Sequence, residues 1–160
     1  MAPAPITVNG RRYGWPERPV VVVCIDGSEP AYFTRAVADG AMPYLAGVRS
    51  TGTDRLADSI VPSFTNPNNL SIVTGVPPSV HGICGNYLFD VQSGTEVMMN
   101  DPKWLRAPTI LAAMANAGQR CAVITAKDKL RKLLGKGIDL AQGSICFSSE
   151  KADVASRAEN

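Results

Sequence analysis

Hydrophobic and polar positions along this chain form blocks of two kinds. Apolar, mostly β-branched residues continue without interruption through positions 19–25, and a second apolar run covers 121–125. Runs of this length are typical of strands that are buried on both faces of a parallel sheet. Apolar positions at helical spacing predict helices at 31–38, 42–49 and 108–118. Alternation of such strands and helices predicts an α/β fold.

The segment 62–75 carries strong local signals. Pro67 suits the first turn of a helix, because proline lacks an N–H that this turn does not need. Gly75 suits the end of the same helix, and a strand is expected at 53–61, before the segment. Thr65 therefore lies at or beside the N-cap, where free N–H groups and the helix dipole favour negative charge. Its hydroxyl is either a helix cap or a nucleophile.

Two strand ends carry charged side chains. Asp26 follows the first apolar run and precedes Gly27, so it is either a metal ligand beyond the carboxyl end of a strand or a cap of the next helix. Lys127 and Lys129 follow the second run and lie on the same expected rim of the sheet. Exposed lysine is the usual alternative for both. Arg131 and Lys132 are expected to be solvated surface.

Weaker signals complete the outline. Residues 6–13, with Asn9-Gly10 at the turn, and residues 87–99 each predict a hairpin. Residues 1–18 are expected to form an N-terminal extension or edge hairpin, and residues 19–160 to form one domain. A helix start is expected near residue 149.

Composition narrows the class of protein. The 160 residues include 45% hydrophobic positions, and the net charge is +2, which gives no electrostatic argument for nucleic-acid binding. No apolar run approaches the roughly 20 residues of a membrane span, and the N-terminus does not have the pattern of a secretory signal. The four cysteines lack metal-ligand spacing and are expected to be buried free thiols, so a cytoplasmic location is expected.

An ordered string of motifs carries a resemblance to a known family. It consists of Asp-Gly at 26–27, Thr-Asn-Pro-Asn at 65–68, Thr-Gly at 74–75, His-Gly-Ile at 81–83 and Cys-Gly-Asn-Tyr at 84–87. This string resembles the phosphodiesterase-like branch of the alkaline phosphatase superfamily, and within that branch it is most similar to the phosphonoacetate hydrolase family. The resemblance covers about residues 20–147.

The resemblance implies a fold and a chemistry. The fold would be a mostly parallel sheet with helices on both faces, incomplete in this chain. Two zinc ions would be held in part by Asp26 and Thr65, and Thr65 would attack phosphorus to give a phosphoenzyme. Asn86 would bind a phosphoryl oxygen, although a turn role is equally compatible with its place after Gly85. Lys127 and Lys129 would bind the carboxylate of a small phosphonate, phosphonoacetate, whose P–C bond is hydrolysed.

The chain has too few metal-binding side chains to hold two zinc ions by itself. Two zinc ions need about six protein donors, and the chain has a single histidine, His81, which is expected to order its loop by hydrogen bonding. We therefore expect the chain to be the N-terminal part of a longer enzyme and to be inactive alone; a homodimer is left open. The alternatives are a zinc phosphodiesterase or nucleotide pyrophosphatase, and a non-catalytic remnant of the fold.

Overall fold

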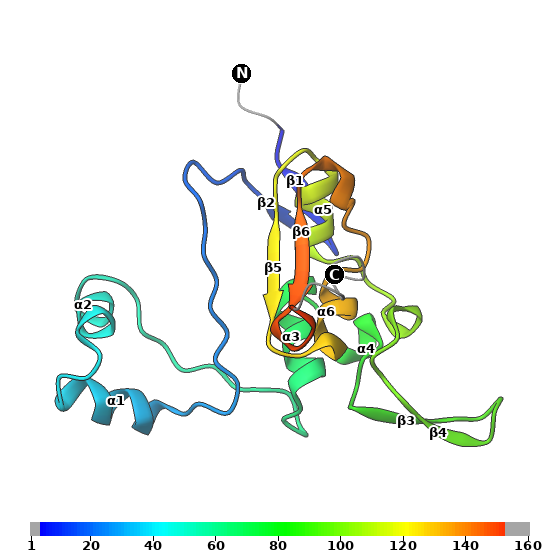
Figure 1. Ribbon diagram of the computed structural model, residues 1–160, viewed down its shortest axis with the longest axis horizontal. Helices are drawn as coiled ribbons and strands as arrows, with labels where there is room; N and C mark the ends of the chain where they lie inside the picture. Colours follow the sequence, from blue (N-terminus) through cyan, green and yellow to red (C-terminus); the bar gives the residue numbers. More distant parts are fainter. Residues whose placement is uncertain (1–3, 153–160) are drawn as a thin grey trace. The chain divides into compact units, whose positions relative to one another are not determined.

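The computed structural model describes residues 4–152, which divide into two units (Figure 1). The second unit is Arg18–Ser59, and the first consists of the described residues on either side of it. Among the described residues, no helix has the length and apolar character needed to cross a bilayer. The expected helix start near residue 149 is a short 3₁₀ helix, Ser149–Lys151, and the continuation expected beyond residue 152 lies outside the described residues.

The second unit contains two helices, α1 (Pro30–Ala38) and α2 (Pro43–Thr51). A proline stands in the first turn of each, where its missing N–H costs no hydrogen bond. Arg35 and Asp39, one turn apart at the end of α1, form an exposed ion pair. Both helices predicted from the apolar spacing are thus confirmed to within two residues.

The strands predicted at 19–25 and 53–61 are not formed, so these two predictions are wrong for the described residues. Val20 and Val21 are 71% and 82% exposed instead of buried. The physical reason is that an apolar run becomes a buried strand only when neighbouring strands accept its backbone hydrogen bonds and helices cover its faces. Within the described residues of the second unit there is no strand to pair with it.

The first unit begins with a hairpin of β1 (Ile6–Val8) and β2 (Arg11–Tyr13). Asn9 and Gly10 both have positive φ, 48° and 77°, as the tight turn requires. The side-chain amide of Asn9 donates to the carbonyl oxygens of Thr74 and Pro108, at 2.8 and 2.9 Å. The predicted hairpin is confirmed, and its turn is tied to two distant parts of the same unit.

Helices and a second hairpin follow in the first unit. The elements are α3 (Thr65–Thr74), α4 (Pro78–His81), β3 (Tyr87–Asp90), β4 (Thr95–Met98), α5 (Ile110–Asn116) and α6 (Asp128–Leu134). β3 and β4 pair antiparallel, as predicted, and Gly75 ends α3 in the left-handed conformation with φ 69°. Short 3₁₀ helices occupy Pro102–Trp104 and Leu140–Gln142.

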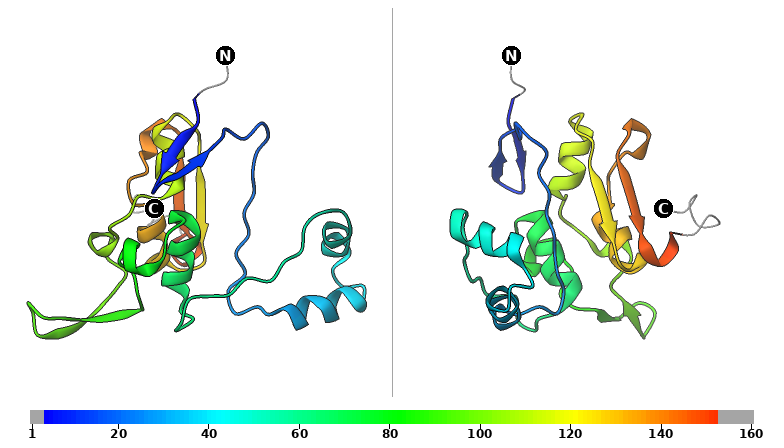
Figure 2. Two further views of the ribbon diagram at one scale, coloured as in Figure 1. Left: turned by 180° about the vertical axis from the view of Figure 1, so that it is seen from behind. Right: turned by 60° about the vertical axis from the view of Figure 1, so that its left-hand side comes forward.

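A parallel pair of strands, β5 (Ala122–Thr125) and β6 (Ile145–Ser148), lies beside α6 (Figure 2). Val123 and Cys146 are buried on one face, whereas Ile124 and Ile145 are 64% and 49% exposed on the other. Of the three strand pairs among the described residues, only this one is parallel. The mostly parallel sheet with covered faces is therefore only partly formed here, because the two runs described above stay unpaired.

The core of the first unit joins α3, α6 and the loops after them. Its larger cluster contains Leu70, Ile83, Met99, Leu105 and Leu133, and its smaller one contains Val123, Leu134 and Cys146. These clusters fix the packing of α3 against α6 and α4, which positions the site described below.

The helix predicted at 108–118 is α5, and the apolar face that its spacing predicts, Ile110, Leu111, Met114 and Ala117, differs from the observed one. Its most buried residues are Ala112 and Ala115, while Ala117 is exposed. A Cβ built on Gly137 would lie only 3.3 Å from Cβ of Ala112, so the loop at Gly137 passes too close for a larger side chain. Small residues are therefore the ones that α5 buries.

The cysteines are free, as predicted, but only Cys146 is fully buried. Cys121 is half-buried, and Cys24 and Cys84 are exposed, so burial was predicted wrongly for these two. Cys24 is exposed because it belongs to the unpaired run at 19–25.

Candidate active site

Thr65 is the first residue of α3. The N-cap position belongs to Phe64, which has extended backbone angles and whose side chain has no hydrogen-bond acceptor. Thr65 is half-buried, and its carbonyl oxygen accepts a hydrogen bond from the Asn69 side chain at 3.0 Å. Thr65 thus lies beside the N-cap, as predicted, and does not occupy the cap position itself.

Two features hold the start of α3 in place. The side chain of Asn68 makes two hydrogen bonds. Its Nδ2 donates to the carbonyl of Phe64 at 2.9 Å, and its Oδ1 accepts from the backbone N–H of Ile60 at 3.1 Å. Asn66 and Pro67 are buried. Side-chain hydrogen bonds of the neighbouring asparagines therefore fix the backbone at Thr65.

The loop after α3 is ordered by His81, which is completely buried. The backbone N–H of Ile83 donates to Nδ1 at 3.1 Å, so the neutral ring carries its proton on Nε2. Nε2 donates to Oγ of Ser71 at 3.0 Å, and Oγ of Ser71 donates to the carbonyl of Pro67 at 2.9 Å. The predicted loop-ordering role of His81 is seen in these bonds, and they reach back to the first turn of α3.

Burial lowers the pKa of His81 below its usual value, because the charged ring would lose its hydration. Nearby Arg106 acts in the same direction, and a backbone hydrogen bond from the ring to Pro67 opposes the effect. Both ring nitrogens are engaged in hydrogen bonds. His81 is therefore a structural residue and has no nitrogen available for a metal ion.

Asn86 follows this loop in a bend that leads into β3, and it is half-buried. Its backbone carbonyl accepts a hydrogen bond from the N–H of Met99 at 2.8 Å, where the β3–β4 hairpin closes. The backbone of Asn86 has the turn role that its place after Gly85 allows. The predicted contact of its side chain with a phosphoryl oxygen stays a prediction.

Asp26 belongs to the second unit, where it starts a turn with Gly27 at φ 70°. Its side chain is exposed. The N-cap of the following helix α1 is Glu29, so Asp26 does not occupy that cap position. Thr65, Asn86, Lys127 and Lys129 all belong to the first unit, and the role of Asp26 as a metal ligand stays a prediction.

Lys127 and Lys129 stand at the start of α6, directly after β5, and both are exposed. Between them lies Asp128, whose side chain is only 12% exposed. Asp128 forms ion pairs with Arg131 at 2.5 Å and with Lys151 at 3.4 Å. The placement of the two lysines at a strand exit is confirmed, and α6 packs against α3, the helix that carries Thr65.

The buried Asp128 was not anticipated from the sequence, and Arg131 was predicted wrongly. The Arg131 side chain is 12% exposed instead of solvated, because it is hydrogen-bonded to Asp128. This hydrogen bond and the charge of Arg131 lower the pKa of Asp128, with a further contribution from Lys151. The spacing Asp128–Arg131, three residues apart on a helix, is the sequence signal that could have revealed the pair.

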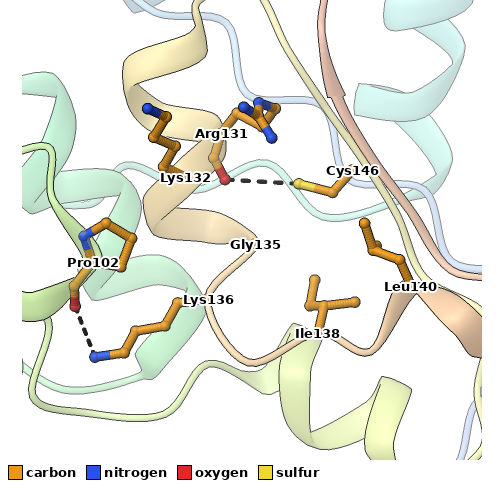
Figure 3. Close-up of a pocket in the computed structure, with 8 residues that line it drawn as sticks. All are labelled: Pro102, Arg131, Lys132, Gly135, Lys136, Ile138, Leu140 and Cys146. Atoms are coloured by element: carbon orange, nitrogen blue, oxygen red, sulfur yellow. Dashed lines mark hydrogen bonds between the residues drawn. The ribbon is translucent and has the colours of Figure 1, made fainter. Parts of the chain in front are cut away.

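A cavity of about 290 Å³ lies beside α6 and is lined by residues that were not predicted for the site (Figure 3). Its three cationic side chains all have partners: Arg131 pairs with Asp128, Nζ of Lys132 lies 4.0 Å from Oδ2 of Asp128, and Nζ of Lys136 donates to the carbonyl oxygens of Pro102 and Leu105. Cys146 also lines it, and burial raises the pKa of this thiol, so the reactive thiolate is disfavoured. The cavity therefore has little chemistry to offer a ligand.

The described residues do not supply a complete set of ligands for two zinc ions. They contain no cluster of three or more His, Cys, Asp or Glu side chains able to hold a metal ion. The donors predicted from the chain are Asp26 and Thr65, which is two of the about six that two zinc ions need.

Comparison with solved structures gives a close match. The chain is similar to the phosphonoacetate hydrolase of Sinorhizobium meliloti 1021, in its complexes with phosphonoformate and with phosphonoacetate. The identities are 61% and 60%, and the TM-scores are 0.89 and 0.90. Each match covers 96% of this chain and 37% of that protein, so the chain spans little more than a third of its structural relative.

More distant relatives are pyrophosphatases and phosphodiesterases. An uncharacterized pyrophosphatase/phosphodiesterase of Schizosaccharomyces pombe is 35% identical over 92 residues, 56% of this chain and 18% of that protein. The venom phosphodiesterase of Macrovipera lebetinus is 27% identical over 115 residues, 68% of this chain and 13% of that protein. The model of the type I phosphodiesterase / nucleotide pyrophosphatase family matches residues 20–132. The chain belongs to the type I phosphodiesterase / nucleotide pyrophosphatase family.

Proposed function

We propose that the protein containing this chain hydrolyses the P–C bond of phosphonoacetate to give acetate and phosphate. The observation that supports this most strongly is the 60% identity, over 96% of the chain, to a phosphonoacetate hydrolase in complex with phosphonoacetate. The substrate has two anionic ends, a phosphonate and a carboxylate. The first unit offers a hydroxyl at a helix start and two exposed lysines at a strand exit, one feature for each end.

In this proposal Thr65 is the nucleophile. The hydroxyl proton of Thr65 passes to solvent, and a bond forms between Oγ of Thr65 and phosphorus while the P–C bond breaks; the carbon keeps the electron pair. Water then attacks phosphorus and breaks the P–Oγ bond, which returns the Thr65 hydroxyl and releases phosphate. The N-terminus of α3 favours negative charge at this position, both on the attacking oxygen and on the phosphoryl group that it carries.

The leaving carbon is the difficult part of the reaction. Its electron pair can delocalise onto the neighbouring carboxylate, which then carries more negative charge until water protonates the carbon to give acetate. Lys127 and Lys129 would bind this carboxylate and stabilise the added charge as it develops. Asn86 would donate to a phosphoryl oxygen through its side-chain amide. Both lysines are exposed, which leaves their ammonium groups accessible to a small anion.

Zinc would be the cofactor, two ions in a complete site, with Asp26 and Thr65 as the ligands from this chain. Bound zinc would lower the pKa of a coordinated hydroxyl and neutralise phosphoryl charge. Because these are two donors only, we propose that the 160-residue chain alone is inactive and that the remaining ligands come from elsewhere in the protein.

The test compares two substrates with the zinc-supplied protein that contains this chain. We expect release of phosphate and acetate in equal amounts from phosphonoacetate, with a kcat/KM well above that for bis(4-nitrophenyl) phosphate. A preference for the diester would support the second candidate, a zinc phosphodiesterase or nucleotide pyrophosphatase, which the family of the chain favours. No turnover of either substrate would leave a non-catalytic remnant of the fold as the better description.

A further inference from the structure

The two lysines proposed for carboxylate binding flank a buried ion-pair network. Asp128 is 8% exposed, and its Oδ1 and Oδ2 face Arg131 and Lys151. Nζ of Lys132 lies 4.0 Å from Oδ2, at the edge of ion-pair distance. A buried carboxylate with these partners is held in one orientation, since breaking a buried pair leaves an uncompensated charge.

The backbone around the two lysines is also fixed by hydrogen bonds. Oε2 of Glu150 accepts from the N–H of Asp128 at 2.8 Å, and the hydroxyl of Thr125 donates to the carbonyl of Lys127 at 2.9 Å. The carbonyl oxygen of Ala126 accepts two hydrogen bonds. One comes from the hydroxyl of Ser149 at 3.1 Å, and the other comes from the backbone N–H of Glu150 at 3.2 Å. The loop from β5 into α6 is thus bonded on both sides of Lys127.

The charges are arranged so that the lysines remain free for an anion. The Asp128 carboxylate is turned toward Arg131 and Lys151, which lower its pKa and keep it ionised. Lys127 and Lys129, the residues before and after it in the sequence, have exposed side chains. A negative charge between two lysines would ordinarily compete with a substrate carboxylate, and the two basic partners offset that effect.

We propose that Asp128 and Glu150 are positioning residues for substrate specificity: they fix the loop so that Lys127 and Lys129 present their ammonium groups together to the substrate carboxylate. This proposal rests on the proposed function. Preorganised cations bind a small dianion more tightly than mobile ones, because less conformational freedom is lost on binding. The network therefore acts on recognition of the carboxylate and not on the phosphonate.

The first test measures whether Asp128→Asn in the full protein raises or lowers the KM for phosphonoacetate. If Asp128 acted only as a negative charge near the lysines, its neutralisation would lower the KM for phosphonoacetate. If it positions them, KM rises by about five- to tenfold. The inhibition constant of methylphosphonate, which has the phosphonate and lacks the carboxylate, is expected to change less than about twofold. A lowered KM, or equal changes in both constants, would overturn the proposal.

Glu150 provides a matched pair of variants in case Asp128→Asn does not fold. Glu150→Gln and Glu150→Ala remove the same charge, but only glutamine keeps an acceptor oxygen for the N–H of Asp128. We expect Glu150→Ala to raise the KM for phosphonoacetate by about fivefold and Glu150→Gln to stay within about twofold of wild type. Equal effects of the two variants would show that charge and not positioning matters, and would refute the proposal.

Failure of the positioning role and failure of the proposed function give different results. Lys127→Ala is the positive control, and it should raise the KM for phosphonoacetate while leaving methylphosphonate inhibition unchanged. Phosphonoacetate turnover by wild type together with unchanged constants in Asp128→Asn and Glu150→Ala would refute the positioning role alone. Absence of wild-type turnover would refute the proposed function and this inference with it.

Discussion

His81 gives a quantitative prediction, because the ring is fully buried and both of its nitrogens have partners. We consider His81→Leu, which introduces an apolar side chain of similar size that can neither accept from Ile83 nor donate to Ser71. The N–H of Ile83, itself a fully buried residue, would lose its acceptor, at a cost of about 1–3 kcal/mol. The lost bond to Ser71 adds about 1 kcal/mol, so the expected destabilisation is about 2–4 kcal/mol.

This change would be measured by urea unfolding of the chain at pH 7.5. Ser71→Ala tests the other half of the network: it removes the acceptor of Nε2 and the donor to the Pro67 carbonyl but leaves the bond at Nδ1, and it should cost about 1–3 kcal/mol. A typical domain has 5–15 kcal/mol of stability, so the larger loss is well resolved. A loss below about 0.5 kcal/mol for His81→Leu would refute the hydrogen-bond network as the reason that the loop is ordered.

The same residue predicts a pH dependence. The pKa of His81 is lowered in the folded chain, whereas the unfolded value is about 6.5. Below pH 6.5 the unfolded state therefore binds more protons, and stability falls as the pH decreases from 6.5 toward the folded pKa. The slope attributable to this group is at most about 1.4 kcal/mol per pH unit. His81→Leu should lose this component, and comparison of the two proteins separates it from the titration of carboxylates.

Because His81 is the single histidine of the chain, its ring can be observed directly by NMR. We expect one imidazole, neutral at pH 7, with its proton on Nε2 and a pKa below 6.5 in the folded protein. A proton on Nδ1, or a pKa at or above 6.5, would contradict the network.

Three further predictions concern the loop and the metal. Gly82→Ala should destabilise the chain by at least about 2 kcal/mol more than Gly118→Ala in urea unfolding. Both glycines have φ near 90°, but only at Gly82 would the new Cβ meet a backbone atom, the Trp104 carbonyl oxygen, at 2.6 Å. Equal losses of stability in the two variants would contradict this. Metal analysis of the purified 160-residue chain should find fewer than two zinc ions, and two ions with phosphate release from phosphonoacetate would show that the chain is sufficient. In the full protein, Asp26→Asn should weaken zinc binding by at least about tenfold in competition with a chelator, and unchanged affinity would remove Asp26 from the ligand set.

Much of the local structure could be predicted because short stretches of sequence determine it. The prolines that begin α1 and α2 and the Asn9-Gly10 turn of the first hairpin act through their own backbone angles. Gly75 ends α3 by adopting φ 69°, which other residues rarely do. Such signals need no distant partner, so they are readable from sequence.

Strand formation and burial depend on partners that the sequence pattern does not identify. The run at 19–25 has the composition of a buried strand but is exposed, because composition does not provide the neighbouring strands. α5 buries alanines because the loop at Gly137 passes close to Ala112, a tertiary contact that a helical spacing pattern does not contain.

The candidate site shows the same division. The positions of Thr65 at a helix start and of Lys127 and Lys129 after a strand were predictable from local patterns. The ion pair of Asp128 with Lys151 was not predictable, because Lys151 lies more than twenty residues further along the chain. The charged residues at the start of α6 therefore have the pattern of a solvated surface, whereas Asp128 and Arg131 among them form a buried ion pair.

Thr65→Ala in the zinc-supplied full protein removes the proposed nucleophile. Phosphate and acetate release from phosphonoacetate would be followed together with circular dichroism and phosphonoacetate binding by calorimetry. We expect Thr65→Ala to keep the fold and to retain measurable binding of phosphonoacetate but to lose turnover by at least about 1,000-fold, since the bond-forming oxygen is gone. Turnover within about tenfold of wild type would show that Thr65 is not the nucleophile and would contradict the account.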